Sequence, residues 1–201
     1  TLGLELVTLD ARLPGLDAHH VGLDNVAATT ILTKHLIERG HSRIAYISGE
    51  SRKYTAMRRL EGFRMTMESA GIIVPPHYVA HADFAGQRSL ACADEMLRLP
   101  DPPTAIIAAN NFICASIIQA VQRCGLKCPD DVSIVSVDPL PWAELITPSI
   151  TCVEQTLPDM AKLATQWIAQ AHGKPRNPEA PRRNAELLPQ LITGDSVKTL
   201  L

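Results

Sequence analysis

The stretch Val132–Asp138 (VSIVSVD) restricts the possible folds of this chain more than any other segment. A glycine and a Pro-Asp-Asp turn precede it, its body is almost wholly apolar, and it ends on an aspartate. An apolar run of this length between turn signals is typical of a parallel strand that is buried on both faces. Ligands of open α/β sheets bind outside the carboxyl ends of such strands. Asp138 is therefore expected where its carboxylate can accept hydrogen bonds from a ligand.

Segments of this kind alternate with amphipathic helices along the whole chain. Apolar residues three and four positions apart, with a glycine after the last one, mark most of the helices. The repeated alternation predicts an α/β fold with a parallel sheet and right-handed crossovers. The expected strands are 4–9, 21–23, 42–48, 78–80, 104–109, 132–138, 149–153 and 186–192, and the expected helices are 26–39, 55–70, 86–99, 112–124 and 158–171.

Composition and charge exclude several functional classes. The 201 residues are 46% hydrophobic and 20% charged, which suffices for a packed core in one large or two small domains. A net charge of −2 argues against free-standing nucleic-acid binding, which needs a basic surface. No apolar run approaches membrane-spanning length. The chain opens directly on a strand pattern without a targeting sequence, as a fragment of a longer protein would.

The cysteines indicate a reduced, cytoplasmic protein. Their number is odd and they are scattered through expected helices and strands, so a disulfide framework is not favoured. Two of them, Cys124 and Cys128, are four residues apart, but no second Cys or His pair accompanies them as a zinc site requires. No metal site is predicted. The five cysteines are Cys92, Cys114, Cys124, Cys128 and Cys152.

Polar side chains follow several expected strands at their carboxyl ends. Together, carboxylates, an amide and a guanidinium can satisfy a ligand with many hydroxyls, and an aromatic ring can stack on the apolar face of a sugar or base. Arg59, one turn into its helix, could bind a carboxylate or vicinal hydroxyls through two N–H groups. These candidate binding residues are Asp24, Lys53, Thr55, Arg59, Phe84, Asn110 and Asp138.

Each candidate also has a purely structural interpretation. Asp24 or Asn110 could cap the helix that follows, since both residue types are favoured there. Arg59 could be a solvated charge or a partner of Asp138, and Phe84 could belong to the core. Asp138 could form a turn with the proline after it. Because all of these residues follow strands on the same side, a binding site is the favoured interpretation.

Catalysis finds little support in the sequence. The glycines form neither a G-x-G-x-x-G fingerprint nor a P-loop, and no G-x-S-x-G motif is present. The seven histidines show no metalloprotease spacing. We therefore predict a binding protein rather than an enzyme, with no cofactor.

Six segments, in order, resemble the effector-binding (core) domain of the LacI/GalR transcriptional regulators. They span nearly the whole chain, from Asp24 and the helix after it. The segments are HLIERGHSRIAYISG (35–49), RRLEGFRMTMESAGI (58–72), PPTAIIAANN (102–111), GLKCPDDVSIVSVD (125–138), TPSITCVEQ (147–155) and LLPQLITGDSV (187–197).

The resemblance implies a type I periplasmic-binding-protein-like fold. In the family, two Rossmann-like subdomains with parallel sheets are joined by three strands, and the effector binds in the cleft between them. Residues 1–42 and 153–185 would form a partial N-terminal subdomain, and 43–152 and 186–201 the C-terminal one. The family's helix-turn-helix headpiece, its hinge helix and the opening of its N-terminal subdomain have no counterpart here. The resemblance thus implies operator binding only through a headpiece that this sequence lacks.

The resemblance also assigns roles to the candidate residues. Arg59, three residues before a Gly-Phe pair, matches the effector-binding arginine, and Lys53 and Thr55 match positions on the loop before it. Phe84 matches the ring that stacks on the ligand. The polar positions of the cleft are matched by Asp24, Asn110 and Asp138.

Some positions depart from the family pattern. Asn111 replaces an aspartate, and Ser136, Val137 and Pro139 replace a glycine, an aromatic residue and a second aspartate. Lys53 next to Arg59 would place two cations in the site. These features suggest the hypothesis that the effector is a sugar acid or another carboxylate.

The implied partners are a small effector, either a sugar or a sugar acid, and a second copy of the chain in a cytoplasmic homodimer. The alternative is a sugar-binding protein of the periplasmic transport type, which shares the fold. A third reading, a Rossmann-type enzyme, lacks the nucleotide fingerprint.

Overall fold

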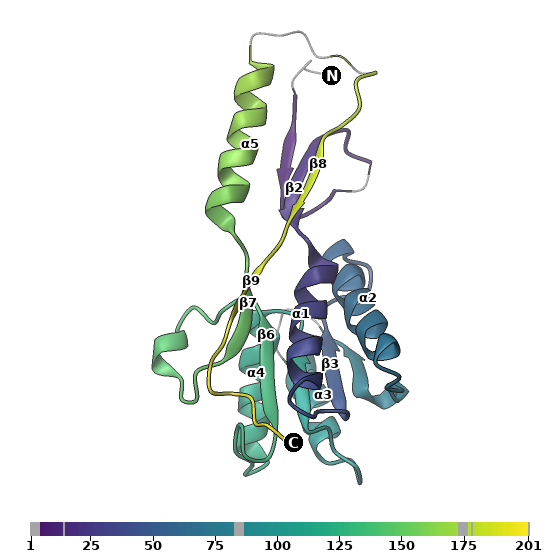
Figure 1. The fold of residues 1–201 in the computed structure, drawn as a ribbon, viewed down its shortest axis with the longest axis vertical. Helices are drawn as coiled ribbons and strands as arrows, with labels where there is room; N and C mark the ends of the chain where they lie inside the picture. Colours follow the sequence, from purple (N-terminus) through teal and green to yellow (C-terminus); the bar gives the residue numbers. More distant parts are fainter. Residues whose placement is uncertain (1–4, 14, 83–86, 173–176, 178, 201) are drawn as a thin grey trace. The chain divides into compact units, whose positions relative to one another are not determined.

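The structure, a computed structural model, describes residues 5–13, 15–82, 87–172, 177 and 179–200. The chain divides into two compact units, each built from segments far apart in sequence. Unit 1 combines residues 1–24 with 155–189, and unit 2 combines residues 25–154 with 190–201. Both units are drawn in Figure 1.

Unit 2 is built on a six-stranded sheet with the order β4-β3-β5-β6-β7-β9. Neighbouring strands are parallel except for β9, which runs antiparallel to β7. Every residue of β3, β5 and β6 is buried, so the prediction of a doubly buried strand at 132–138 is confirmed. The strands are β3 (Ile44–Ser48), β4 (Val79–His81), β5 (Ala105–Ala108), β6 (Ser133–Val137), β7 (Thr151–Glu154) and β9 (Gln190–Ile192).

Two helix pairs pack on this sheet. Helix α1 packs against α2, and α3 packs against α4, and members of both pairs contact the strands. Two short 3₁₀ helices, η1 (Pro76–Tyr78) and η2 (Ala143–Leu145), lie in connections. The helices are α1 (Asn25–Ile37), α2 (Tyr54–Ser69), α3 (Gln87–Leu97) and α4 (Asn111–Arg123), each within one or two residues of its predicted bounds.

The contact between α1 and α2 is unusually close at Gly62. A Cβ atom there would lie 2.3 Å from the backbone oxygen of Val26 and 2.5 Å from Oγ1 of Thr29. The Thr29 hydroxyl also donates a 2.6 Å hydrogen bond to the backbone oxygen of Arg59 on α2. Only a glycine fits at position 62, and the close packing fixes the amino-terminal half of α2 against α1.

Unit 1 is a smaller layer of three parallel strands in the order β1-β2-β8, with one helix. The elements are β1 (Val7–Leu9), β2 (His19–Leu23), α5 (Leu157–Ala171) and β8 (Asn184–Leu187). Its buried cluster joins Val21 of β2 to Met160 and Ala164 of α5, with partly buried apolar residues around them. The apolar stripe of α5 therefore covers the sheet.

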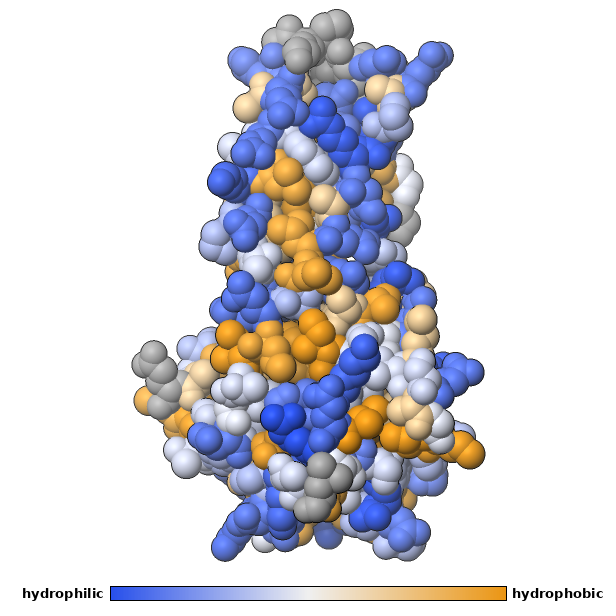
Figure 2. All heavy atoms as spheres, viewed as in Figure 1, coloured by the Kyte–Doolittle hydropathy of each residue, from blue (hydrophilic) through white to orange (hydrophobic). Residues whose placement is uncertain are grey.

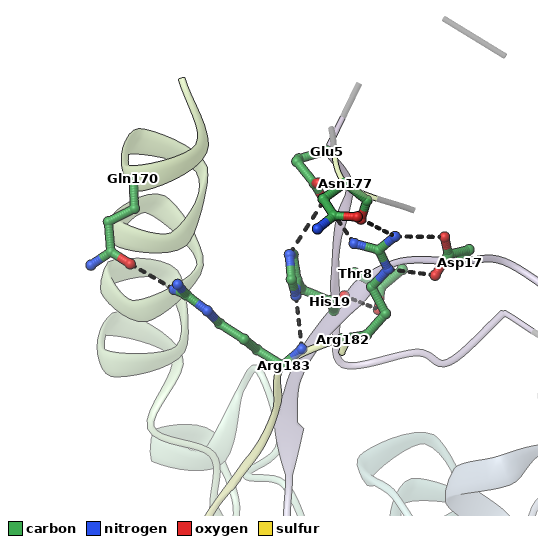
Figure 3. A network of polar contacts seen from close by, with 8 residues as sticks. All are labelled: Glu5, Thr8, Asp17, His19, Gln170, Asn177, Arg182 and Arg183. Carbon is green, nitrogen blue, oxygen red and sulfur yellow. Dashed lines mark hydrogen bonds and ion pairs between the residues drawn. The ribbon is translucent and has the colours of Figure 1, made fainter. Parts of the chain in front are cut away.

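Charged residues link the segments of unit 1 that are distant in sequence (Figure 3). The Arg182 guanidinium donates to both carboxylate oxygens of Asp17 at 2.5 and 2.8 Å and to Glu5 at 3.3 Å. The backbone N–H of Arg183 donates to Nδ1 of His19 at 2.8 Å. These contacts tie the approach to β8 to the first two strands.

The structure differs from the sequence-based expectations in three respects. The expected strand 186–192 is two strands, because Pro189 lacks the N–H that a continuous ladder needs; β8 pairs in unit 1 and β9 in unit 2. The β7–β9 pair is antiparallel rather than parallel. Helix α1 belongs to unit 2, where it packs on α2, so the compact units divide at 24/25 and not at the expected 42/43.

None of the helices within the described ranges is long and apolar enough to cross a membrane. On the face shown in Figure 2, hydrophilic residues predominate and apolar residues gather in patches on each unit.

Substitution of Gly62 by Ala is expected to lower the free energy of unfolding by about 1–3 kcal/mol, because the added methyl overlaps backbone and hydroxyl oxygens of α1. Urea unfolding followed by circular dichroism measures this change. Gly49→Ala is the matched control, since its Cβ would meet only the Cβ of Ala56 at 3.9 Å. Equal stability of the two variants would show that α1 can move away from α2.

Stability is also expected to depend on pH through buried histidines. Burial lowers the pKa of His41 below its ordinary value of 6.5, and its ring contacts Thr104 Oγ1 and the Lys198 backbone oxygen, each at 2.9 Å. His20 and His35 are shifted in the same direction, chiefly by burial. Because the folded state favours the neutral rings, their contribution is complete above pH 6.5 and is lost as the pH falls through the lowered pKa values.

We therefore expect Tm to fall as the pH is lowered from about 7.5 to about 5, in a differential scanning calorimetry series. His41→Gln should lower Tm at the higher pH and reduce the size of the fall. The same change at the exposed His77 should leave the pH profile as it is. A flat profile for the unsubstituted chain would contradict this expectation.

Candidate functional site

Arg59 lies at the carboxyl edge of the six-stranded sheet and is 7% exposed. Its Nε donates a 2.7 Å hydrogen bond to Oδ1 of Asn25, and its Nη1 donates to the backbone oxygen of Ala109. Asn25 begins α1 and Ala109 follows β5, so the guanidinium joins two elements to α2. It is neither the solvated charge nor the partner of Asp138 that the structural alternatives proposed.

Both hydrogen bonds of the Arg59 side chain go to neutral oxygens. Within the described part of the chain, no carboxylate forms an ion pair with it, and its Nη2 makes no hydrogen bond. A buried cation without a charged partner is costly, and an anionic or strongly accepting ligand would offset that cost. Arg59 is therefore held in place by the fold with one donor nitrogen left for a ligand.

Asn110 acts as the N-cap of α4. Its Oδ1 accepts a 2.9 Å hydrogen bond from the backbone N–H of Ile113, as a helix N-cap does. The structural alternative for this residue is therefore confirmed. The side chain is 9% exposed and follows β5 directly after Ala109, whose carbonyl binds Arg59. Since the cap uses Oδ1, the amide nitrogen is the part of Asn110 that remains for a ligand.

Asp138 ends β6 in a left-handed backbone conformation, with φ of 68°. Its N–H donates to the backbone oxygen of Val153 at 2.9 Å, and its own carbonyl accepts from the Ser136 hydroxyl at 3.0 Å. Aspartate is among the few residue types that tolerate this conformation. The residue therefore makes a tight turn at the strand end, and its half-buried side chain lies at the same sheet edge as Arg59 and Asn110.

The other candidates have varied positions. Lys53 is the exposed residue before α2 and Thr55 is half-buried in the first turn of that helix, so both belong to the segment that leads to Arg59. Asp24 is half-buried in unit 1, where its N–H donates to the backbone oxygen of Leu187 at 2.8 Å. Phe84 lies outside the described residues.

Asn25 is a partner of the site arginine that the sequence pattern did not predict. It is a buried residue whose Oδ1 fixes the Arg59 side chain. The only sequence signal for this role is the position of Asn25, directly after the aspartate that ends an expected strand.

The cysteines are all free thiols. Burial raises the pKa of Cys114 to about 12 and those of Cys128 and Cys152 to about 11, so these thiols are poor nucleophiles and poor metal ligands. Across the described ranges, no group of three His, Cys, Asp or Glu residues could hold a metal ion.

Comparison with known proteins places this fold in a family. Residues 33–197 match the periplasmic binding protein-like domain. The HTH-type transcriptional repressor PurR of Photobacterium profundum is 33% identical over 170 residues, covering 85% of this chain and 50% of the relative. The ribose operon repressor of Haemophilus influenzae is 27% identical over 199 residues, covering 99% and 59%. The crystal structure of a LacI family regulator from Mycobacterium smegmatis superposes with a TM-score of 0.84 at 29% identity, covering 96% of this chain and 70% of that one.

The chain therefore belongs to the periplasmic binding protein-like family. Within it, the chain is an effector-binding domain of the LacI/GalR type, as its repressor relatives and structural neighbours show. It spans about half the length of the curated relatives that it matches.

Substitution of Asn110 by Ala is expected to lower the free energy of unfolding by about 1 kcal/mol, because it leaves the first turn of α4 without its cap. Asn110→Asp keeps an accepting oxygen and should retain most of the stability. Chemical denaturation of both variants tests the cap, and equal losses would contradict it.

Proposed function

We propose that the chain is the effector-sensing domain of a LacI/GalR-type transcriptional regulator and binds a small sugar or sugar acid. The observation that supports this most directly is Arg59, which is buried, fixed by neutral oxygens and left with a donor nitrogen at the carboxyl edge of a parallel sheet. Such an arrangement binds an accepting group of a small polar ligand. In the full regulator, ligand binding would shift the population of two states and so change operator affinity.

In this proposal, each candidate binding residue has the role that the family resemblance implies for it. Arg59 binds the ligand directly, Asn110 offers its amide nitrogen and Asp138 its carboxylate. Lys53 and Thr55 contribute from the segment before Arg59, while Asp24 and Phe84 are proposed as further contacts from the resemblance alone. Operator DNA would be bound by a headpiece outside this sequence, in the cytoplasm.

We also propose that the regulator is a homodimer. Phe112, Trp142 and Leu145 are large apolar residues that are 57%, 45% and 86% exposed. They lie on the segments that follow β5 and β6, which are neighbours in the sheet. Large apolar side chains exposed on neighbouring segments support a protein–protein interface there.

The alternative, a sugar-binding protein of the periplasmic transport type, shares the fold. Five free cysteines favour the regulator, because an oxidising compartment would expose them to disulfide formation. The repressor relatives favour it as well.

The test is isothermal titration calorimetry with a panel of named probes: D-ribose, D-glucose, D-galactose, D-glucuronate, D-galacturonate and D-gluconate. We expect at least one probe to bind and Arg59→Lys to weaken it by about tenfold or more, since an ammonium cannot replace the forked contacts of a guanidinium. Arg58→Lys is the matched control, because Arg58 pairs with Glu61 on the outer side of the same helix.

Circular dichroism and the Tm of each variant establish that Arg59→Lys still folds. Failure of the unsubstituted chain to bind any probe at millimolar concentration would refute the proposed ligand class. Binding that is equal in the Arg59 and Arg58 variants would refute the site.

A further inference from the structure

Two hydroxyl groups near the carboxyl end of β3 are fully buried and make no hydrogen bond of normal geometry. They are the phenol of Tyr46 and the hydroxyl of Ser48, both on side chains that are 0% exposed. Residues two apart on a strand point to the same face of the sheet. The Tyr46 ring stacks on Phe63 of α2, with 5.1 Å between ring centroids, so both hydroxyls lie on the face that α2 covers.

An unpaired buried hydroxyl destabilises a fold, and each of these two has a simple apolar substitute in Phe or Ala. The other buried hydroxyls within the described residues are paired. The Tyr78 phenol donates to the Asp101 backbone oxygen at 2.6 Å, and the Ser133 hydroxyl accepts from the Lys198 backbone N–H at 3.0 Å. Among the described residues, buried hydroxyls without a hydrogen bond therefore occur at the end of β3, the sheet edge to which we assign the ligand.

The groups around these hydroxyls can act as hydrogen-bond donors. Burial raises the pKa of Tyr46, although the Arg59 charge and the Ser48 hydroxyl oppose the rise, so the phenol keeps its proton and can donate it. His81 of β4 is paired in register with Ser48, and its Nδ1 is also buried without a partner. Arg59 can only donate. A set of donors beside a buried cation matches an acceptor-only, negatively charged group.

We propose that Tyr46, Ser48 and Arg59 form a carboxylate-binding subsite, which makes the effector an acid such as a uronic or aldonic acid. This inference rests on the proposed function and deepens it by naming the ligand class. With the ligand bound, the Ser48 hydroxyl and Arg59 Nη2 donate to the carboxylate, and Ser48 Oγ then accepts from the Tyr46 phenol. The ligand charge pairs with the buried guanidinium, which a neutral sugar cannot do.

The first test needs no ligand and compares matched variants by Tm. Tyr46→Phe and Ser48→Ala are expected to leave Tm unchanged or raise it, because they remove unpaired buried groups. Tyr78→Phe and Ser133→Ala, which break existing hydrogen bonds, are expected to lower it. If Tyr46→Phe and Ser48→Ala lower Tm as much as their controls, the hydroxyls are paired in the free protein and the inference fails.

The second test titrates matched probes that differ only at C6, D-glucuronate against D-glucose and D-galacturonate against D-galactose. We expect an acid to bind about tenfold or more tightly than its neutral counterpart, and Ser48→Ala and Tyr46→Phe to remove most of that preference. Ser133→Ala should retain it, since this residue lies at the opposite, amino-terminal end of β6.

Other outcomes overturn the inference while leaving the proposed function standing. These are tighter binding of the neutral sugar, binding of ribose but of no acid, and an acid preference that both variants retain because the hydroxyls hold only a water molecule. Absence of binding to every probe overturns the proposed function and the inference together.

Discussion

The contact of α1 with α2 around Gly62 is the constraint on which the rest of unit 2 depends. Because no side chain separates the helices there, Thr29 reaches the backbone oxygen of Arg59 at 2.6 Å. The same approach brings Asn25 within 2.7 Å of the arginine Nε. The close packing of α1 on α2 therefore also fixes the position of the Arg59 side chain. The stability of the fold and the geometry of the site both depend on Gly62.

Much of the fold could be predicted from local patterns. Val132–Asp138 and the helix at 112–124 were predicted correctly because buried strands and amphipathic helices leave strong periodic signals. The split of 186–192 into β8 and β9 could not be predicted in the same way, since a short apolar run does not show which sheet each half joins. The membership of α1 in unit 2 depends on tertiary packing against α2, which no local pattern records.

The candidate site was predictable in position more than in detail. Strand ends mark the edge where Arg59, Asn110 and Asp138 lie, because every parallel strand delivers its carboxyl end to the same side. The partners of Arg59 come from 34 and 50 residues away along the chain, so only the folded structure reveals them. The unpaired hydroxyls of Tyr46 and Ser48 are invisible in sequence for the same reason, since pairing is a property of neighbours in space.

The way the chain passes between the units has a consequence for its synthesis on the ribosome. The polypeptide leaves unit 1 at residue 24, returns at 155 and leaves again at 189, so neither unit is a continuous segment. The sheet of unit 1 gains its third strand only when residues 184–187 emerge, and the sheet of unit 2 gains its last strand only with residues 190–192. Nascent chains therefore expose unfinished edges of both sheets until residues 184–192 have been made, and this short stretch decides whether either unit closes.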